Sequence, residues 1–309
     1  MKNYIFIIFI LFLGFSFYSC EEEFAPSDVK AKQEYVVEGH LEASRLGIPT
    51  FVILSKSTSY FSTLDSALVE NLYIDDADVF VFDGQNNVEL SYVCAKDLSF
   101  PLLLKLYGVL GNKIFNSKFC AYLDLDNKLN IAEEREYKLH IEHEGNIIES
   151  TTTIPKNVML DSLYFKEPPG DPIDSAAMMW VRFSDPKDES DFYRYFVIEN
   201  FKKVYSYNSL FDDMIVDGKT IDLPFRKPVD PRSSDFNRDI GFTYLRGDTL
   251  QFKLCALDKA HYGFWESFQF SNNQGPFTSY IRAKDNIEGG IGIWGGYACK
   301  VVDVIVPMK

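Results

Sequence analysis

The sequence contains few histidines and cysteines, and it lacks the short motifs that are typical of common enzyme and metal-binding families. Its 309 residues include 4 histidines and 5 cysteines, and no two cysteines have the Cys-x-x-Cys spacing of zinc and thiol-redox sites. It contains neither Gly-x-Ser-x-Gly nor His-Glu-x-x-His. We therefore expect no metal, no cofactor and no catalytic residue. A hydrolase with an unmarked pair of carboxylates stays open, because acidic residues are plentiful.

Basic residues are outnumbered by acidic ones. The chain has 31 Lys and Arg against 45 Asp and Glu, a formal net charge of −14 at pH 7. Such a surface repels phosphate backbones, which argues against a nucleic-acid partner. It also repels anionic lipid headgroups, so we expect any membrane attachment to come from acyl chains rather than from a basic patch.

The chain has one long uncharged apolar run, at its N-terminus. Lys2 precedes the run, which extends from Tyr4 to Tyr18 and is followed by Ser19-Cys20. The run is shorter than the about 20 residues of a membrane span, and its pattern is typical of a secretory signal peptide. A cysteine directly after the cut is the lipidation site of a bacterial lipoprotein. We predict a lipoprotein signal peptide over residues 1–19 and palmitate-type acyl chains on Cys20 that hold the protein in the outer membrane. An ordinary cleaved signal with a chance cysteine is the alternative.

Three acidic residues, Glu21, Glu22 and Glu23, follow Cys20 directly. They resemble the surface-export signal of lipoproteins in Bacteroidota-type bacteria, which predicts a protein that faces the cell exterior. Retention on the periplasmic side is the alternative. In either case like charges keep the segment extended, so we predict an acidic tether over residues 20–33.

Four cysteines remain beyond Cys20: Cys94, Cys120, Cys255 and Cys299. Four cysteines allow three pairings, and disulfides persist in exported proteins. If the two halves of the chain fold separately, Cys94–Cys120 and Cys255–Cys299 is the favoured set. Buried free thiols are the alternative.

Apolar and polar residues alternate in many short segments, which is the period of a half-buried strand. Residues 35–42, 88–94 and 137–154 show this pattern, with turns rich in Gly, Asn and Asp between them. We predict a mainly β protein of two immunoglobulin- or fibronectin-like β-sandwich domains, residues 34–156 and 157–309. Tyr35, Val37 and Leu41 would face the core, and Glu38, His40 and Glu42 would lie on the opposite face.

We predict one short helix, in the second half. Asp258 can accept from the free N–H groups of a first turn, and His261, Phe264, Trp265 and Phe268 recur at helical spacing. The apolar segment from Phe100 to Leu110 is a second point of interest. It would be either buried core or an exposed patch that binds a partner, and core is favoured.

Two groups of polar residues are candidates for a cation site. His140 and His143 are three apart in a predicted strand, so they point to opposite faces and cannot bind one ion together. Four acids occur in one predicted turn, and oxygen ligands suit calcium: Asp185, Asp188, Glu189 and Asp191. Their spacing matches no calcium loop, which favours a solvated turn.

A glycine-rich run precedes the last predicted strand. Its members are Gly289, Gly290, Gly292, Trp294, Gly295, Gly296 and Tyr297. The run holds no Gly-Lys-Ser/Thr, and a strand rather than a helix follows it, which argues against a phosphate-binding loop. Glycines in a strand permit a bulge or a close backbone approach, which we expect under Trp294 and Tyr297.

Several phrases resemble an uncharacterised lipoprotein family of Bacteroidota. They are Tyr35–Gly39, Leu160–Leu163, Phe192–Phe196, Gly247–Leu250, Tyr262–Trp265 and, most specifically, Asn286–Tyr297. The resemblance covers essentially the whole chain after Cys20. It implies a gene beside a TonB-dependent outer-membrane transporter, and hence a role in capturing or handing over a ligand. The family has no assigned catalytic residues, so the resemblance implies none here.

These observations predict a non-enzymatic binding or accessory component of a TonB-dependent nutrient uptake system. A surface adhesion or assembly protein is the alternative from another class, and the carboxylate-dependent hydrolase is a third. The ligand and the transporter are not encoded in any pattern of the sequence.

Overall fold

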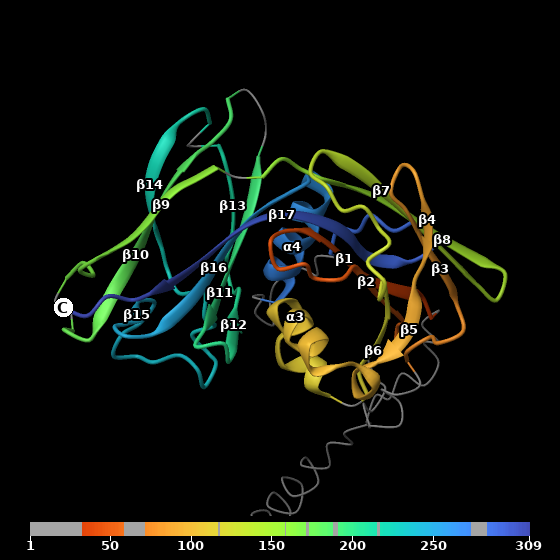
Figure 1. The fold of residues 1–309 in the computed structure, drawn as a ribbon, viewed down its shortest axis with the longest axis horizontal. Coiled ribbons are helices and arrows are strands. Elements are labelled where there is room, and N and C mark those ends of the chain that lie inside the picture. Colours follow the sequence, from red (N-terminus) through yellow and green to blue (C-terminus); the bar gives the residue numbers. More distant parts are fainter. Residues whose placement is uncertain are drawn as a thin grey trace, which may run out of the picture. The chain divides into compact units, whose positions relative to one another are not determined.

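The computed structural model describes residues 33–58, 72–116, 118–157, 159–170, 173–187, 191–214, 217–272 and 283–309 (Figure 1). The chain divides into two compact units. The first, Met1–Gln33 with Thr58–Thr63, lies almost wholly outside the described residues; the second, Glu34–Ser57 with Leu64–Lys309, contains the elements below. The predicted signal peptide, Cys20, Glu21 to Glu23 and the tether up to residue 32 therefore lie outside the described residues.

The largest sheet has nine strands, and eight of them follow the order β12-β11-β16-β17-β1-β2-β6-β5, with β13 pairing β11. The strands are β1 (Tyr35–Ala43), β2 (Phe51–Lys56), β5 (Ser91–Cys94), β6 (Cys120–Leu123), β11 (Phe192–Glu199), β12 (Lys203–Tyr205), β13 (Leu210–Asp212), β16 (Thr249–Leu257) and β17 (Ile291–Ile305). The β1–β17 pair is parallel and the other pairs are antiparallel.

Two smaller sheets pack on one face of the large sheet and make two hydrophobic cores. The first has the order β4-β3-β7-β8 and the second has β14-β10-β15 with β9 pairing β10. Their strands are β3 (Asp78–Phe82), β4 (Asn87–Glu89), β7 (Arg135–His143), β8 (Asn146–Ile154), β9 (Met159–Lys166), β10 (Ala176–Ser184), β14 (Thr220–Phe225) and β15 (Tyr244–Leu245). The mainly β fold predicted from the alternating residues is therefore confirmed, and both cores have the sandwich arrangement.

The strand β17 does not respect the boundary that we placed after residue 156. Trp294 and Ala298 lie in the first core, whereas Val304 and Val306 pack in the second. The strand is 15 residues long and pairs with β1 on one side and with β16 on the other. At about 3.3 Å per residue it is long enough to serve both cores. The two sandwiches thus share one sheet.

Among the described residues, two helices and two short 3-10 helices accompany the strands: α3 (Phe100–Leu110), α4 (Lys259–Asn272), η1 (Ala95–Asp97) and η2 (Gly111–Phe115). The apolar face of α3 packs on Phe51 of β2, and Trp265 of α4 packs on Tyr297 of β17. Phe51 and Tyr297 point away from the two sandwich cores, because successive side chains of a strand alternate. The large sheet is therefore covered on both faces, and we call the face that meets α3 and α4 its helix side (Figure 1).

The prediction of a single helix was wrong, because the segment after Ser99 forms α3. A proline in its first turn is a helix-start signal, but the nearly unbroken apolar composition hid the helical period. Leu106, Tyr107 and Leu110 are buried, whereas Phe100 is 66% exposed. The favoured interpretation, buried core, holds for one side of the helix, and the other side is exposed.

The helix predicted after Asp258 is confirmed as α4. The backbone N–H of His261 donates to Asp258 Oδ1 at 2.8 Å, which is the expected N-cap bond. The other oxygen, Oδ2, accepts from the Thr152 hydroxyl of β8 at 2.6 Å. This one carboxylate therefore ties the start of α4 to the first sandwich.

Candidate functional site

Charged and polar side chains lie buried on the helix side of the large sheet. They are His40 and Glu42 of β1, Arg194 of β11, Lys253 of β16, Tyr297 of β17 and His261 of α4, each at most 6% exposed. The strands β11, β16, β17 and β1 are consecutive neighbours in the sheet. Burying charge costs free energy unless it is paired, so this group is the most unusual feature of the described chain.

The structure corrects our assignment for His40 and Glu42. We placed both on a face opposite the core, as in a strand with one side in water. The alternation itself is right, since Val37 and Leu41 face the first core. His40 and Glu42 are nevertheless 6% and 4% exposed, because the helix side is covered as well.

Glu42 forms a buried ion pair with Lys253. Lys253 Nζ lies 2.7 Å from Glu42 Oε2, and the two side chains are 1% and 0% exposed. Burial alone would raise the pKa of Glu42, but the Lys253 charge and a hydrogen bond from His40 outweigh it and hold the pKa below its usual range. His40 Nε2 donates to the same oxygen at 3.2 Å. Burial lowers the pKa of His40 despite this carboxylate neighbour, so His40 is neutral at pH 7.

Arg194 has no such charged partner within the part of the chain that the structure describes. Its Nη1 donates to the hydroxyl of Tyr297 at 3.0 Å. Its guanidinium carbon lies 3.9 Å from the centre of the Trp265 ring and 4.8 Å from that of Phe196. Among the described residues, nothing accepts a hydrogen bond from Arg194 Nε. Contacts with aromatic faces offset part of the cost of burying this cation.

His261 lies against the glycine run. Its ring centre is 4.3 Å from that of Tyr297, and its Nδ1 is 3.3 Å from the Gly296 carbonyl oxygen. A Cβ on Gly295 would lie 2.4 Å from the His261 ring, so glycine is needed there. Burial and the nearby Arg194 charge lower the pKa of His261 to about 3.

Four members of the group, His40, Arg194, His261 and Tyr297, line a pocket of about 650 Å³, which we call the helix-side pocket. Its wall consists of Glu38, Gly39, His40, Phe51, Val109, Leu110, Gly111, Lys113, Arg194, Phe196, Val204, Ser206, Tyr207, Asn208, Asp230, Arg232, His261, Trp265, Phe268, Gln269, Ile293 and Tyr297. Arg232 Nη2 pairs with Asp230 Oδ2 at 3.0 Å. Aromatic walls with a few polar groups are typical of small-molecule sites.

Sequence reasoning missed Arg194, Lys253 and the pocket. The signal in the sequence was a charged residue within a strand whose residues before and after that position are apolar or aromatic. Arg194 stands within Phe192–Glu199, and Lys253 within Thr249–Leu257. Such a position indicates a strand buried on both faces, with the charge enclosed.

The glycine run serves close packing, as predicted. A Cβ on Gly292 would lie 1.9 Å from the Val37 carbonyl oxygen, and one on Gly296 would lie 2.7 Å from Ile154. Trp294 is fully buried, and its ring lies over Gly39 of β1, where a Cβ would come within 2.3 Å. A Cβ on Gly289 or Gly290 would likewise lie 2.4 or 2.8 Å from a backbone oxygen atom.

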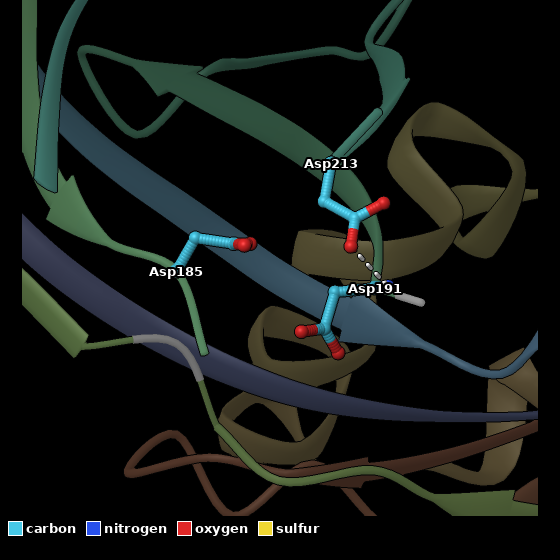
Figure 2. Close-up of side chains that lie close together, drawn as sticks. All are labelled: Asp185, Asp191 and Asp213. Atoms are coloured by element: carbon cyan, nitrogen blue, oxygen red, sulfur yellow. Dashed lines mark hydrogen bonds between the residues drawn. The ribbon is translucent and has the colours of Figure 1, made fainter. Parts of the chain in front are cut away.

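Three carboxylates lie together near one end of β11, two from the segment between β10 and β11 and one from the end of β13. Figure 2 shows Asp185, Asp191 and Asp213, whose oxygens come within 4.8 Å of one another. We predicted the first two as neighbours; Asp213 comes from the end of β13, and Asp188 and Glu189 lie outside the described residues. Asp185 accepts from the Tyr193 hydroxyl at 2.5 Å and Asp213 from the Asp191 N–H at 3.0 Å. Because groups of the chain itself already donate to Asp185 and Asp213, we assign no cation to the cluster.

The histidines of β7 lie on opposite faces, as predicted. His140 pairs with Glu142 and Glu149 at 2.9 and 2.8 Å near the surface, and these carboxylates raise its pKa. His143 is buried, with Asp76 at 2.9 Å. The two rings cannot share one ion.

Both cysteine pairs favoured by the sequence are disulfides, Cys94–Cys120 and Cys255–Cys299. Each joins directly opposed residues of neighbouring antiparallel strands, β5–β6 and β16–β17. The second bridge lies in the helix-side cluster that contains Tyr297.

Lowering the pH from 7 to 5 is expected to reduce the free energy of unfolding by about 2 kcal/mol through His261 alone. The unfolded chain binds a proton on this histidine below its ordinary pKa of 6.5, whereas the folded pKa is about 3. The unfolded state thus binds more protons between these values, and stability falls as the pH falls. Urea unfolding at pH 7 and pH 5 measures the effect.

His261→Gln should make this pH-dependent loss smaller by about 2 kcal/mol. His140→Gln is the matched control. The folded pKa of His140 is raised, so its contribution has the opposite sign, being present at low pH and lost as the pH rises. Its removal should leave the decline from pH 7 to pH 5 at least as steep as in the wild type. Equal slopes for His261→Gln and the wild type would contradict the assignment.

Comparison with known proteins gives a family but no activity. A search of curated proteins finds no match. Within the described part of the chain, no helix combines the length and the apolar character needed to cross a membrane. Residues 21–301 match the family model described as a domain of unknown function, DUF4249. The chain therefore belongs to the DUF4249 family of uncharacterised domains.

Proposed function

We propose that this protein is a lipid-anchored binding protein that captures a small ligand in the helix-side pocket. The observation that carries the proposal is the pocket itself, which places the buried Arg194 beside the aromatic rings of Trp265 and Tyr297. Its volume of about 650 Å³ lies within the usual range for ligand sites, about 300–1,000 Å³. The pocket lies between the large sheet and the helices α3 and α4, which supports a preformed site.

The anchor in this proposal is Cys20. The matched family region begins at residue 21, directly after the cysteine, which is consistent with a mature chain that starts at Cys20. Two disulfides fit a protein that works outside the reducing cytoplasm. Two or more acyl chains hold a protein in a bilayer durably, and Glu21 to Glu23 would direct it to the cell exterior.

We further propose that the ligand is bound without being converted. General acid–base catalysis works best with a pKa near the working pH. Of the two histidines in the pocket, His261 has a pKa lowered to about 3 and His40 also has a lowered pKa. Both are thus poor proton carriers at neutral pH. This favours a binding role over the hydrolase alternative.

The receiver of the ligand would be a TonB-dependent transporter, as the family resemblance implies. The net charge of −14 argues against nucleic acid as the partner. An accessory protein that faces the exterior and holds a small molecule fits the capture step of uptake. An adhesion protein would instead bind a macromolecule over a broad surface.

Cys20→Ala is expected to release the protein from the outer membrane while its thermal unfolding midpoint stays unchanged. Extraction of the wild type in mild detergent should copurify a barrel transporter, identified by mass spectrometry. The Cys20→Ala chain, expressed at equal level, is the control for contacts that need the anchor. Cys20 without acyl chains overturns the anchor, and a wild-type pull-down without a transporter overturns the accessory role.

A further inference from the structure

Arg194 is a buried cation that no carboxylate of the described residues neutralises. Glu42 and Lys253 neutralise each other at 2.7 Å, and Arg232 pairs with Asp230 at 3.0 Å. Arg194 instead donates to Tyr297, a neutral phenol. No described carboxylate lies within 4.0 Å of the Arg194 guanidinium, although this side chain is 6% exposed. The folded protein thus keeps one charge away from water without an ion pair.

The cost of this arrangement is large in the free protein. A buried charge that lacks a partner is strongly destabilising. The faces of Trp265 and Phe196 offset part of this cost through cation–π contacts. An anion that enters the pocket would supply the missing pair and a hydrogen-bond acceptor.

The formal charge of the pocket wall is positive, like that of Arg194. Lys113, Arg194 and Arg232 contribute three positive charges, and Glu38 and Asp230 contribute two negative ones. One positive charge is therefore in excess, in a chain that is otherwise strongly acidic. A recess lined by apolar walls concentrates such a field and attracts the opposite charge. A single excess charge matches a monoanion.

The rest of the wall fits an apolar body. The aromatic rings come from Phe51, Phe196, Trp265 and Phe268, and aliphatic side chains come from Val109, Leu110 and Ile293. Trp265 both stacks on the guanidinium and lines the pocket, so a ligand bound to Arg194 would pack beside its indole.

We infer that the ligand is an apolar monocarboxylic acid, whose carboxylate pairs with Arg194 and whose body packs on the aromatic wall. This inference rests on the proposed function, because it names the chemical class of ligand for the same pocket. It assigns Arg194 as the residue that selects charge, and the surrounding rings as the residues that select shape.

Three probes with one body and three head charges test it: 3-phenylpropanoate, 3-phenylpropanamide and 3-phenylpropylammonium. Equilibrium dialysis against the full lipidated protein in detergent, with detergent-only cells as blanks, gives the Kd of each. The acid should bind at least tenfold more tightly than the amide, and the ammonium more weakly than both. Arg194→Gln should weaken binding of the acid at least tenfold and change binding of the amide less than threefold.

Arg182→Gln is the control, since it removes an arginine outside the pocket wall that has an acidic partner, Asp222. It should change the affinity for the acid less than threefold. Arg194→Lys keeps the charge and should retain a preference for the acid, which covers the case that Arg194→Gln does not fold. Equal binding of acid and amide by the wild type, or unchanged acid binding by a folded Arg194→Gln protein, overturns the inference and leaves the pocket as a binding site. Failure of all three probes to bind overturns both the inference and the proposed pocket function.

Discussion

Gly292→Ala is expected to destabilise the fold by about 3–5 kcal/mol, from backbone strain and a steric clash together. Gly292 has a φ of +123°, and a Cβ there would lie 1.9 Å from the Val37 carbonyl oxygen. Val37 is the residue paired with Gly292 in the parallel β1–β17 ladder. A shift of either strand would disturb the one parallel contact that joins β1 to the end of the chain. Urea unfolding followed by near-ultraviolet circular dichroism measures the loss.

Gly84→Ala is the matched control for this change. Gly84 also has a positive φ, +90°, but a Cβ on it would meet nothing within 4 Å. Only backbone strain remains, and the expected cost is about 1–2 kcal/mol. The difference between the two variants isolates the close approach of β1 and β17. Equal losses would show that the approach contributes nothing.

The strands could be predicted from the sequence because their alternation is strong and local. Tyr137, Leu139 and Ile141 face the first core as their spacing indicates. The start of α4 was found for the same kind of reason, since the Asp258 cap acts within one turn. The disulfides followed from the assumption that the two halves of the chain fold separately, although β17 contributes residues to both cores.

The covering of the helix side could not be predicted in this way. Whether the second face of a strand meets water depends on elements far along the chain, here α3 and α4. The apolar run of α3 has no clear helical period, so no helix was predicted there. The strands that it covers were therefore expected to have one solvent-exposed face. His40 and Glu42 were misplaced as a result, because a polar residue opposite a core is ordinarily solvated. Lys253 lies 211 residues from Glu42, a pairing that no local pattern contains.

Lys253→Met is expected to destabilise the protein by about 3–5 kcal/mol, the usual effect of breaking a buried ion pair. The Glu42 carboxylate would remain enclosed, with Oε1 already lacking a hydrogen-bond partner among the described residues. The double variant Lys253→Met with Glu42→Leu should recover most of this loss, because an apolar pair of similar volume is often neutral or stabilising. Arg182→Met is the control on a surface pair. Its partner Asp222 lies 2.6 Å away, with side chains 52% and 29% exposed, and we expect a much smaller loss there, because solvent screens an exposed pair.

The single variant should also acquire a new pH dependence through His40. Lys253 now lowers the pKa of His40, whereas Glu42 raises it. Without Lys253 the carboxylate acts on His40 unopposed, so the folded pKa of His40 rises and protonation replaces the lost cation. A group with a raised folded pKa contributes stability that is lost as the pH increases, so Lys253→Met should be less stable relative to the wild type at pH 8 than at pH 6. A cost that is the same at both pH values, or a double variant as unstable as the single one, would mean that the pair does not govern this part of the sheet.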